Sequence, residues 1–367
     1  MSINIDTNHF FNQESLNLFK LFTNNNRYKK NCIFDVVSII RSLYALSKGV
    51  YLQDEEKVHS VLKLFEESPK STFARSGIFL RSNLEIEDSY KKTMQNNNFY
   101  VDYMPFNVNG IKRVNQNINA LFPIWPGKNI HFLNDVLSSD IRLYIKDESI
   151  FSAEWREPFQ SSQPENFYIG DDVNIKVPMM VRDNYIEYML TFDTKDMKWV
   201  SMKYSRDKSM LIIMPNKART YTELVDFCVN DLMAEDIYNF YHEYGKDRPY
   251  SSKKMPKFQF ESKWDISNNT SNNDQIEIDY VSTLFKPNLD LRKMCQNLGP
   301  ENTCDRLLQS TSSILNNEYG TFVFTKTEIY EVDGIIKKEH KLVIDKSFIF
   351  IILDKNKKIC QIGIYAG

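Results

Sequence analysis

The residue types that most often carry out catalysis occur in this chain, but not at the spacings that catalysis needs. The sequence contains no Gly-x-Ser-x-Gly elbow, no phosphate-binding Gly-x-x-x-x-Gly-Lys loop and no His-Glu-x-x-His pair. We therefore expect that the protein is not an enzyme and that it holds no metal ion and no cofactor. Five histidines are present, and none lies at metal-ligand spacing from another: His9, His59, His131, His242 and His340.

One short segment, Tyr330–Gly334, has the composition of a protease cleavage site. Caspases cut after an extended x-Glu-Val-Asp that is followed by a small residue, and granzyme B also requires Asp before the scissile bond. The basic specificity pocket of such proteases pairs with one carboxylate, so a neutral residue cannot replace Asp333 without a large loss of recognition. A tetrapeptide of this kind also arises by chance in roughly one such chain in ten. The candidate reactive bond is Asp333–Gly334, and the residues that would fill the preceding subsites are Tyr330, Glu331 and Val332.

The composition excludes several classes of protein. Hydrophobic residues make up 42% and aromatic residues 13% of the 367 residues, which is enough for a large core and excludes a disordered chain. The 46 basic and 48 acidic residues give a net charge of −2, so no overall field favours nucleic acid or a membrane. The five cysteines are scattered and predict reduced thiols. Because the first residues do not resemble a secretory signal, we expect a cytoplasmic location.

Hydrophobic periodicity predicts helices early in the chain and strands later. No linker rich in Pro, Gly or Ser divides the sequence, so we expect one domain over residues 1–367. Helices followed by mixed sheets predict an α+β fold. The expected helices cover 10–22, 36–46, 55–65, 87–95 and 222–241. The expected strands cover 77–84, 174–181, 185–191, 199–204, 209–214, 348–353 and 359–365.

Several segments, taken in order and spacing, are similar to motifs of the serpins. The main three are FSAEWREPF at 151–159, IKVPMM at 175–180 and the closing hairpin FIFIILDKNKKICQIGIY at 348–365. Weaker matches lie at 31–50, 255–258 (MPKF) and 317–321 (NEYGT). The chain therefore resembles the serpin family over essentially its whole length.

This resemblance implies a monomeric serpin fold with three β-sheets, eight or nine helices and an exposed reactive-centre loop with its hinge over 319–341. It also implies a suicide mechanism, in which a protease attacks the loop and the cleaved loop then inserts as a new strand in the large central sheet. Such a protein is metastable and releases its strain once.

The family's motif assigns three positions at the top of the central sheet, where insertion begins. The matching residues are Trp155, Lys257 and Glu318. In the family, the Lys–Glu pair steadies the hinge of the loop. The alternative interpretation is an ordinary surface salt bridge worth under about 1 kcal/mol.

The hinge of the loop has the alternation that a buried strand needs. Every second residue is β-branched, which suits a pleated surface packed on one side: Thr321, Val323, Thr325, Thr327 and Ile329. The expected hinge residues are Glu318, Gly320, Thr321, Val323 and Thr325. Phe322 and Phe324 differ from the small residues that are usual in inhibitory serpins. They leave open a non-inhibitory serpin that acts as a binding protein.

The position of Asp333 supports its assignment as the residue before the scissile bond. The thirteen residues from Thr321 to Asp333 match the spacing in the poxvirus cytokine-response-modifier serpins. A commoner loop length would instead place Gly334 before the bond. A third register uses Lys337 or Lys338 and implies a trypsin-like target.

The resulting expectation is a cytosolic protease inhibitor whose partner is a host caspase or granzyme B and which blunts apoptosis and inflammation. The divergence from the family fits a viral or parasite source, and a virus-infected host cell is the corresponding location. No contact with nucleic acid or membrane is expected. Besides Phe322 and Phe324, the chain departs from the family at Asp35–Val36, which replace a Ser-Pro pair, and at Asp147, Ser347 and Ile364. Asp35 and Asp147 place carboxylates beneath the sheet, where a buried charge needs a partner.

Overall fold

The computed structural model describes residues 5–24, 31–51, 55–69, 73–122, 131–136, 141–170, 173–183, 186–267, 278–286, 289–299, 307–323 and 340–367. The chain divides into two compact units. The first unit comprises Met1–Val36, Phe151–Trp264 and Gln309–Gly367, and the second comprises Val37–Ile150 and Asp265–Leu308. Eight α-helices and two β-sheets lie within the described ranges, which confirms the α+β class. The expectation of a single domain stays a prediction.

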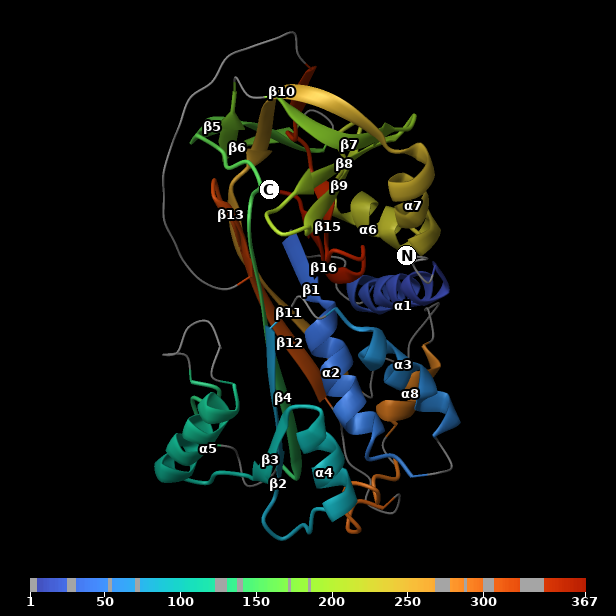
Figure 1. Cartoon of the computed structure of the whole chain (residues 1–367), viewed down its shortest axis with the longest axis vertical. Coiled ribbons are helices and arrows are strands. Elements are labelled where there is room, and N and C mark those ends of the chain that lie inside the picture. Colours follow the sequence, from blue (N-terminus) through green and yellow to red (C-terminus); the bar gives the residue numbers. More distant parts are fainter. Residues whose placement is uncertain are drawn as a thin grey trace. The chain divides into compact units, whose positions relative to one another are not determined.

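The first unit contains a ten-stranded sheet (Figure 1). Its strands follow in the order β1 (Asn31–Asp35), β16 (Ile359–Tyr365), β15 (Phe348–Leu353), β9 (Ser209–Pro215), β8 (Met197–Lys203), β7 (Glu187–Asp193), β10 (Lys246–Pro256), β6 (Val173–Arg182) and β5 (Ser161–Gly170). The short strand β14 (His340–Val343) pairs with β10 in parallel. Because β10 pairs with β7 through its first residues and with β6 through its last, it joins two of the three sheets that we expected to be separate.

The core of this sheet is built around the closing hairpin. Every residue of β15 and β16 is buried, as expected for continuous apolar runs. The ring of Tyr365 stacks on that of Phe258 with centroids 4.6 Å apart, and Phe348 and Phe350 complete an aromatic cluster. Asp35, one of the two unexpected carboxylates, is buried and accepts a hydrogen bond of 3.1 Å from the Gln361 amide.

Three helices of the first unit contribute their apolar faces to the core, namely α1 (Ile5–Asn24), α6 (Tyr221–Asn230) and α7 (Ala234–Asn239), and the π-helical turn η3 (Phe240–Tyr244) follows α7. The single helix that we predicted over 222–241 is therefore divided. Asp236 accepts a hydrogen bond from the Met233 amide at 2.8 Å, which starts a new helix one turn after α6 ends.

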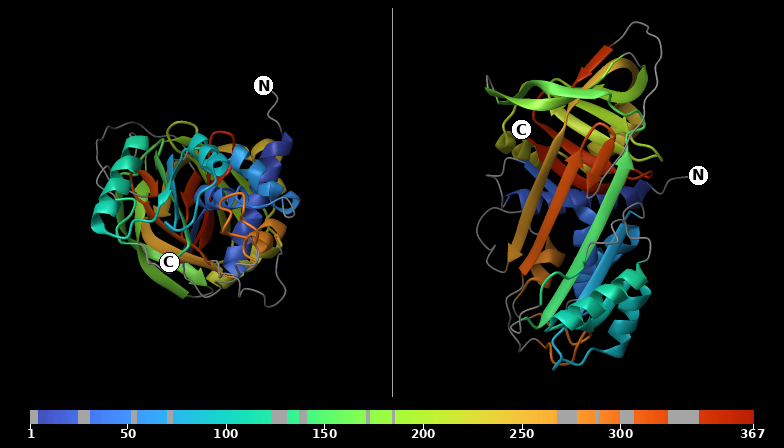
Figure 2. Two further views of the ribbon diagram at one scale, coloured as in Figure 1. Left: turned by 90° about the horizontal axis from the view of Figure 1, so that it is seen from below. Right: turned by 90° about the vertical axis from the view of Figure 1, so that its left-hand side faces the viewer.

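The strand β4 (Leu143–Glu154) belongs to a six-stranded sheet, and its residues up to Ile150 are counted in the second unit and the rest in the first. In the first unit, the residues of β4 from Phe151 onward lie beside β13 (Gly320–Val323), β12 (Leu307–Asn316) and β11 (Phe258–Ser267), in that order (Figure 2). In the second unit, the earlier residues of β4 pair antiparallel with β2 (Phe73–Leu80), which pairs in parallel with β3 (Phe99–Tyr103). The strand that we predicted over 77–84 lies four residues earlier, as β2.

The helices of the second unit are α2 (Val36–Ser47), α3 (His59–Glu67), α4 (Asp88–Asn96), α5 (Val108–Leu121) and α8 (Asp279–Leu284), with the short 3-10 turn η2 (Glu56–Val58) before α3. Helix α5 was not predicted. It begins at Asn107, whose side chain accepts a hydrogen bond from the Gly110 amide, and it buries Val114 and Ile118.

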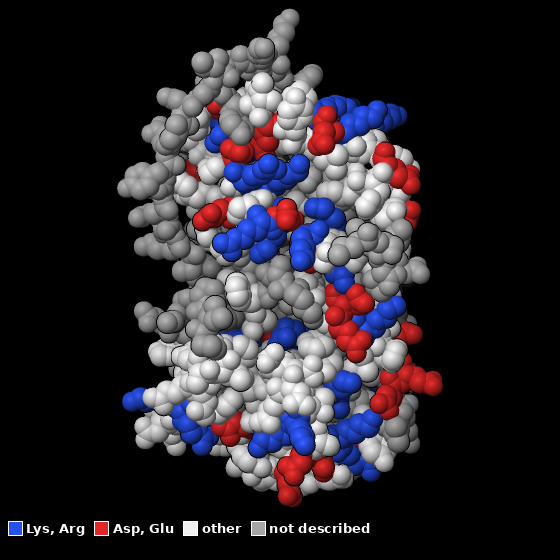
Figure 3. Space-filling view, viewed as in Figure 1, with Lys and Arg blue, Asp and Glu red and all other residues white. Residues whose placement is uncertain are grey.

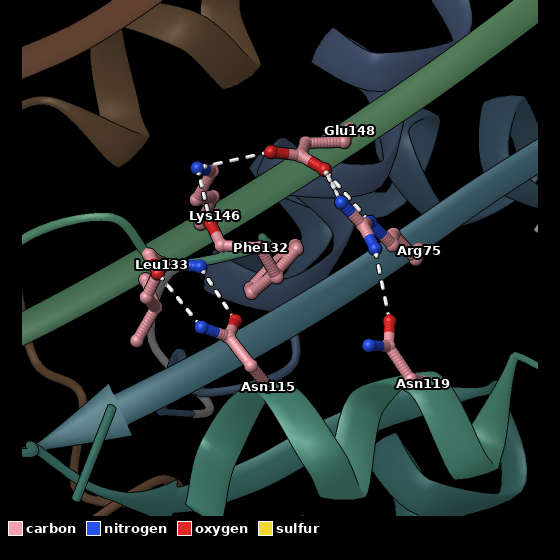
Figure 4. A network of polar contacts seen from close by, with 7 residues as sticks. All are labelled: Arg75, Asn115, Asn119, Phe132, Leu133, Lys146 and Glu148. Atoms are coloured by element: carbon pink, nitrogen blue, oxygen red, sulfur yellow. Dashed lines mark hydrogen bonds and ion pairs between the residues drawn. The ribbon is translucent and has the colours of Figure 1, made fainter. Parts of the chain in front are cut away.

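A network of ion pairs and hydrogen bonds links the strands β2 and β4 of the second unit beside α5 (Figure 4). Arg75 on β2 has no exposed surface, and its guanidinium contacts the carboxylate of Glu148 on β4 at 2.7 Å. Glu148 also pairs with Lys146 at 3.0 Å. Arg75 reaches Asn119 of α5 at 3.4 Å, so the network includes the helix as well as both strands.

A second set of polar contacts attaches residues 131–136 to α5 (Figure 4). The Asn115 amide group donates to the Leu133 carbonyl at 2.8 Å and accepts from the Leu133 amide at 2.9 Å. Lys146 donates to the Phe132 carbonyl at 2.5 Å. Such two-sided pairing satisfies polar groups that burial would otherwise leave unpaired.

Candidate functional site: the hinge of the loop

The hinge begins with a tight turn between β12 and β13. The Asn317 side-chain oxygen accepts hydrogen bonds from the backbone amides of Tyr319 at 3.0 Å and Gly320 at 3.2 Å. The Asn317 amide in turn donates to the Gly320 carbonyl at 3.0 Å. An Asn side chain that caps its own turn in this way makes the chain reverse direction within three residues. The chain therefore returns antiparallel to β12.

The first residues of the loop form a strand between two others. Thr321 lies opposite Asn316 of β12 and opposite Ala153 of β4, and Val323 lies opposite Phe151. Figures 1 and 2 show this short strand, β13, beside β4. The beginning of the hinge is thus already part of the sheet in the uncleaved chain.

Gly320 is required where the hinge enters the sheet. A Cβ atom at this position would lie 2.3 Å from the carbonyl oxygen of Ala153 and 2.7 Å from the Cα of Glu154. Both contacts are with backbone atoms of β4, which cannot rotate away as a side chain could. Only glycine permits β13 to approach β4 this closely.

Thr321 is fully buried, whereas the next residue, Phe322, is partly exposed. The hydroxyl of Tyr204 donates to the Thr321 hydroxyl oxygen at 2.6 Å, and the Thr321 hydroxyl donates to the Asn316 side-chain oxygen at 2.9 Å. The Asn316 amide group then donates to the Pro256 carbonyl at 3.2 Å. The hinge threonine is therefore the central member of a continuous buried hydrogen-bond chain.

The three residues that the resemblance assigned to the start of insertion lie together at this turn. The Trp155 indole donates to the Asn317 carbonyl at 3.0 Å, and the Trp155 amide donates to the Tyr319 carbonyl at 2.7 Å. The Lys257 ammonium lies 3.0 Å from the Glu318 carboxylate. The turn is therefore held from both sides.

Charge at the turn is balanced by local contacts. Burial raises the pKa of the Glu318 carboxyl, but hydrogen bonds from its own backbone amide and from the Lys257 and Ser162 side chains outweigh burial and lower this pKa below its ordinary value. Glu318 is therefore ionised at neutral pH, as its pairing with Lys257 requires.

Two residues of the hinge site were not found from the sequence. Tyr204 and Asn316 contact Thr321 only because strands far apart in the chain pair in one register. The ring of Tyr204 stacks on Trp155 with centroids 4.4 Å apart.

The remaining site residues lie outside the described residues. They are Thr325, Tyr330, Glu331, Val332, Asp333, Gly334, Lys337 and Lys338. The backbone of Val323 is described as part of β13. The assignment of Asp333–Gly334 as the reactive bond therefore stays a prediction.

Asp147, the second unexpected carboxylate, lies in the second unit and has charged and polar partners. Its carboxylate lies 2.9 Å from the Arg41 guanidinium and accepts a hydrogen bond from the Ser76 hydroxyl. The guanidinium also lies over the Phe99 ring, 4.7 Å from its centroid. Burial raises the pKa of Asp147 to about 6, although Arg41 and Ser76 act in the opposite direction.

The described part of the chain was also searched for metal-binding groups, for membrane-spanning helices and for charged patches. In these residues no group of three or more His, Cys, Asp or Glu side chains is arranged to hold a metal ion. Among the described helices none is long and apolar enough to span a bilayer. Figure 3 shows Lys and Arg side chains interleaved with Asp and Glu on the face that it presents, as expected from a net charge of −2.

Comparison with known proteins places these features in a family. Residues 11–366 match the model of the family described as Serpin (serine protease inhibitor). Serine proteinase inhibitor 1 of Vaccinia virus (strain Copenhagen) is 22% identical over 92% of this chain and 95% of its own length. Human corticosteroid-binding globulin is 25% identical over 53% of each chain, so the match spans about half the length of that relative. The crystal structure of human glycosylated kallistatin superposes with a TM-score of 0.73 at 17% identity, over 100% of this chain and 99% of the other.

These matches correct the expectation that the protein is not an enzyme. The absence of catalytic motifs led us to set enzyme chemistry aside, but members of this family are suicide substrates that act on proteases. A serpin takes part in the covalent chemistry of its target without being a catalyst itself. With the family model matching nearly the whole sequence and a fold that superposes on solved serpins, this chain belongs to the serpin family.

Proposed function

We propose that this serpin inhibits an Asp-specific host protease, a caspase-1-like enzyme or granzyme B, by presenting the Asp333–Gly334 bond. The observation that carries the proposal is the position of β13. The first residues of the hinge, Gly320–Val323, already pair with both β12 and β4, which supports the proposal that the rest of the loop can follow them into the sheet. Insertion of the rest of the loop after cleavage extends the same two ladders.

The bulky residue at the hinge is compatible with insertion. Phe322 lies opposite Leu315 on one side and opposite Ser152 on the other, and Ser152 is small and exposed. Its ring therefore has room on the outer face of the sheet, while the β-branched Thr321 occupies the buried face. This arrangement supports an inhibitory serpin over one whose loop stays outside the sheet.

The chemistry of inhibition depends on the target. A caspase attacks through a cysteine thiolate, so the trapped species is a thioester, whereas granzyme B attacks through serine and leaves an ester. Thioesters hydrolyse more readily, so we expect a more durable complex with granzyme B. The similarity to the vaccinia serpin supports action inside a virus-infected host cell, where inhibition of either protease blunts apoptosis or inflammation.

The test is to mix the purified protein with granzyme B, caspase-1 and trypsin separately and to analyse the products on a denaturing gel. The released loop fragment is identified by mass spectrometry. We expect a covalent complex with granzyme B or caspase-1 and cleavage after Asp333, both lost in the variant Asp333→Ala. The double variant Lys337→Ala/Lys338→Ala is the matched control and retains the complex. Cleavage only at the lysines, with loss of the complex in the double variant, contradicts the proposal and indicates a trypsin-like target.

A second candidate function is a binding protein without inhibitory activity. One relative, corticosteroid-binding globulin, carries a binding role in its name and matches about half of this chain. Thermal unfolding separates the two functions. A serpin that inserts its loop gains considerable thermal stability after the loop is cut, whereas one that does not insert is unchanged.

A further inference from the structure

The hinge threonine is held in the sheet by a residue outside the motifs that define the hinge. Tyr204 directly follows β8, more than a hundred residues before Thr321, and its hydroxyl reaches Thr321 at 2.6 Å. We propose that Tyr204 is a positioning residue that keeps the hinge docked between β12 and β4 before cleavage, acting through the hydroxyl of Thr321.

The hydrogen bonds that join Tyr204, Thr321 and Asn316 all run in one direction. This direction determines which side chains can replace Thr321. Tyr204 donates to Thr321, and the Thr321 hydroxyl donates onward to the Asn316 side-chain oxygen at 2.9 Å. The side chain at 321 must therefore accept one hydrogen bond and donate another. Serine meets both requirements, and valine, which has the same shape as threonine, meets neither. Valine leaves two buried polar groups without partners.

Tyr204 is itself held rigidly, so its hydroxyl is in place before the hinge docks. It is 2% exposed, its ring stacks on Trp155 with centroids 4.4 Å apart, and it meets the ring of Phe151 edge-on at 5.8 Å. Burial raises the pKa of its hydroxyl, which therefore keeps its proton and remains a donor. A donor whose position is fixed by packing favours the one position of the acceptor in which the hydrogen bond can form.

Docking determines how much of the loop is free for a protease. With Val323 in the sheet, the ten residues from Phe324 to Asp333 separate the docked hinge from the proposed scissile bond. Release of the hinge adds free length on the same side of that bond. We therefore expect Tyr204 to restrain protease attack on the loop. This consequence rests on the proposed function, whereas the docking itself does not.

Hydrogen exchange of the intact protein, measured by mass spectrometry on the fragment that covers residues 317–323, tests the docking directly. We expect Tyr204→Phe and Thr321→Val each to raise exchange at 321–323 by about tenfold or more, and Thr321→Ser to stay within about threefold of the native protein. The double variant Tyr204→Phe/Thr321→Val exchanges no faster than the faster single variant, because both remove one interaction.

The matched control is Tyr241→Phe. Tyr241 is a second, partly buried tyrosine of the same unit, and its hydroxyl contacts the hydroxyls of Ser201 at 3.0 Å and Ser209 at 3.3 Å, neither of which belongs to the hinge. Its removal leaves exchange of the hinge unchanged. Equal effects of Tyr204→Phe and Tyr241→Phe on the hinge fragment, or failure of Thr321→Ser to preserve protection, overturn the proposal.

The protease assay separates this proposal from the proposed function. If Tyr204→Phe frees the hinge but no variant forms a covalent complex with any protease, Tyr204 positions the hinge and the inhibitory function fails. If the native protein forms the complex and Tyr204→Phe changes neither hinge exchange nor the rate of complex formation, the function stands and the role of Tyr204 fails.

Discussion

The ammonium group of Lys257 lies 3.0 Å from the carboxylate of Glu318 at the turn where β12 ends and the loop begins. The two side chains differ in burial, since Lys257 is 39% exposed and Glu318 is 15% exposed. Solvent screens the lysine, so the pair alone contributes under about 1 kcal/mol. Glu318 also accepts hydrogen bonds from its own backbone amide and from Ser162. The carboxylate is therefore worth more to the turn than the lysine is.

This difference gives a prediction about pH. The pKa of Glu318 is lowered in the folded protein. The ionised carboxylate therefore stabilises the folded state fully at pH values above 4.5, the ordinary pKa of Glu, and this contribution is lost as the pH falls through the lower pKa of the folded protein. We expect the stability difference between native protein and Glu318→Gln to be constant at neutral pH and to disappear in acid below pH 4.5. Urea unfolding at a series of pH values measures it. A difference that grows in acid contradicts this sign. Lys257→Gln, as the control, has the smaller effect at pH 7.

The close contact at Gly320 predicts that a single methyl group expels the hinge. In Gly320→Ala the new Cβ meets the Ala153 carbonyl at 2.3 Å, so β13 must leave β4. We expect the loop to be cut faster by thermolysin, by about tenfold or more, because proteolysis follows the population of the open form. Gly170→Ala is the matched control, since its Cβ meets only the Thr220 methyl group at 3.5 Å. Equal cleavage rates for the two variants contradict the docked hinge.

For Asp147 we predict a pH dependence of stability opposite in sign to that of Glu318. Burial raises its pKa to about 6, so the stability that follows from a neutral Asp147 is complete below the unfolded value of 3.8 and is lost as pH rises through 6. We expect the native protein to lose up to about 2–3 kcal/mol relative to Asp147→Asn between pH 4 and pH 7. Unfolding in urea at pH 4, 5, 6 and 7 measures this difference. A difference that does not vary with pH shows that Asp147 is ionised throughout, held by Arg41.

The closing hairpin shows what the sequence can specify. The apolar runs at 348–353 and 359–365 are bounded by a polar turn and have only one arrangement that buries them, so prediction and structure agree residue for residue. The break in the expected helix 222–241 was not visible, because apolar residues continue through Leu232 while the cap formed by Asp236 decides where α7 starts. Helix α5 was missed because polar residues dominate it and only Val114 and Ile118 are buried apolar positions.

The hinge site was predictable only in part, because some of its contacts depend on how distant strands pair. Trp155, Lys257 and Glu318 belong to short local motifs that are recognised by their order and spacing along the chain. The chain of hydrogen bonds through Thr321 joins residues from three strands, and nothing in the sequence near Tyr204 indicates which strand its hydroxyl will face. Contacts set by strand register need the structure, because a shift of one residue reverses the side on which every side chain lies.

Arg75 provides the last prediction, because its side chain is fully buried, whereas Arg113, which forms a similar ion pair in the same unit, is largely exposed. Removal of the guanidinium in Arg75→Met leaves Glu148 with Lys146, so we expect a loss of about 2–3 kcal/mol, below the range for a completely orphaned charge. The matched variant is Arg113→Met, whose partner Asp102 lies at 3.1 Å and whose side chain is 59% exposed. That exposed pair contributes under about 1 kcal/mol. Urea unfolding of both variants measures the difference. If the two losses are equal, burial of Arg75 does not strengthen its pairing, and the network beneath α5 contributes no more to stability than an ordinary surface pair.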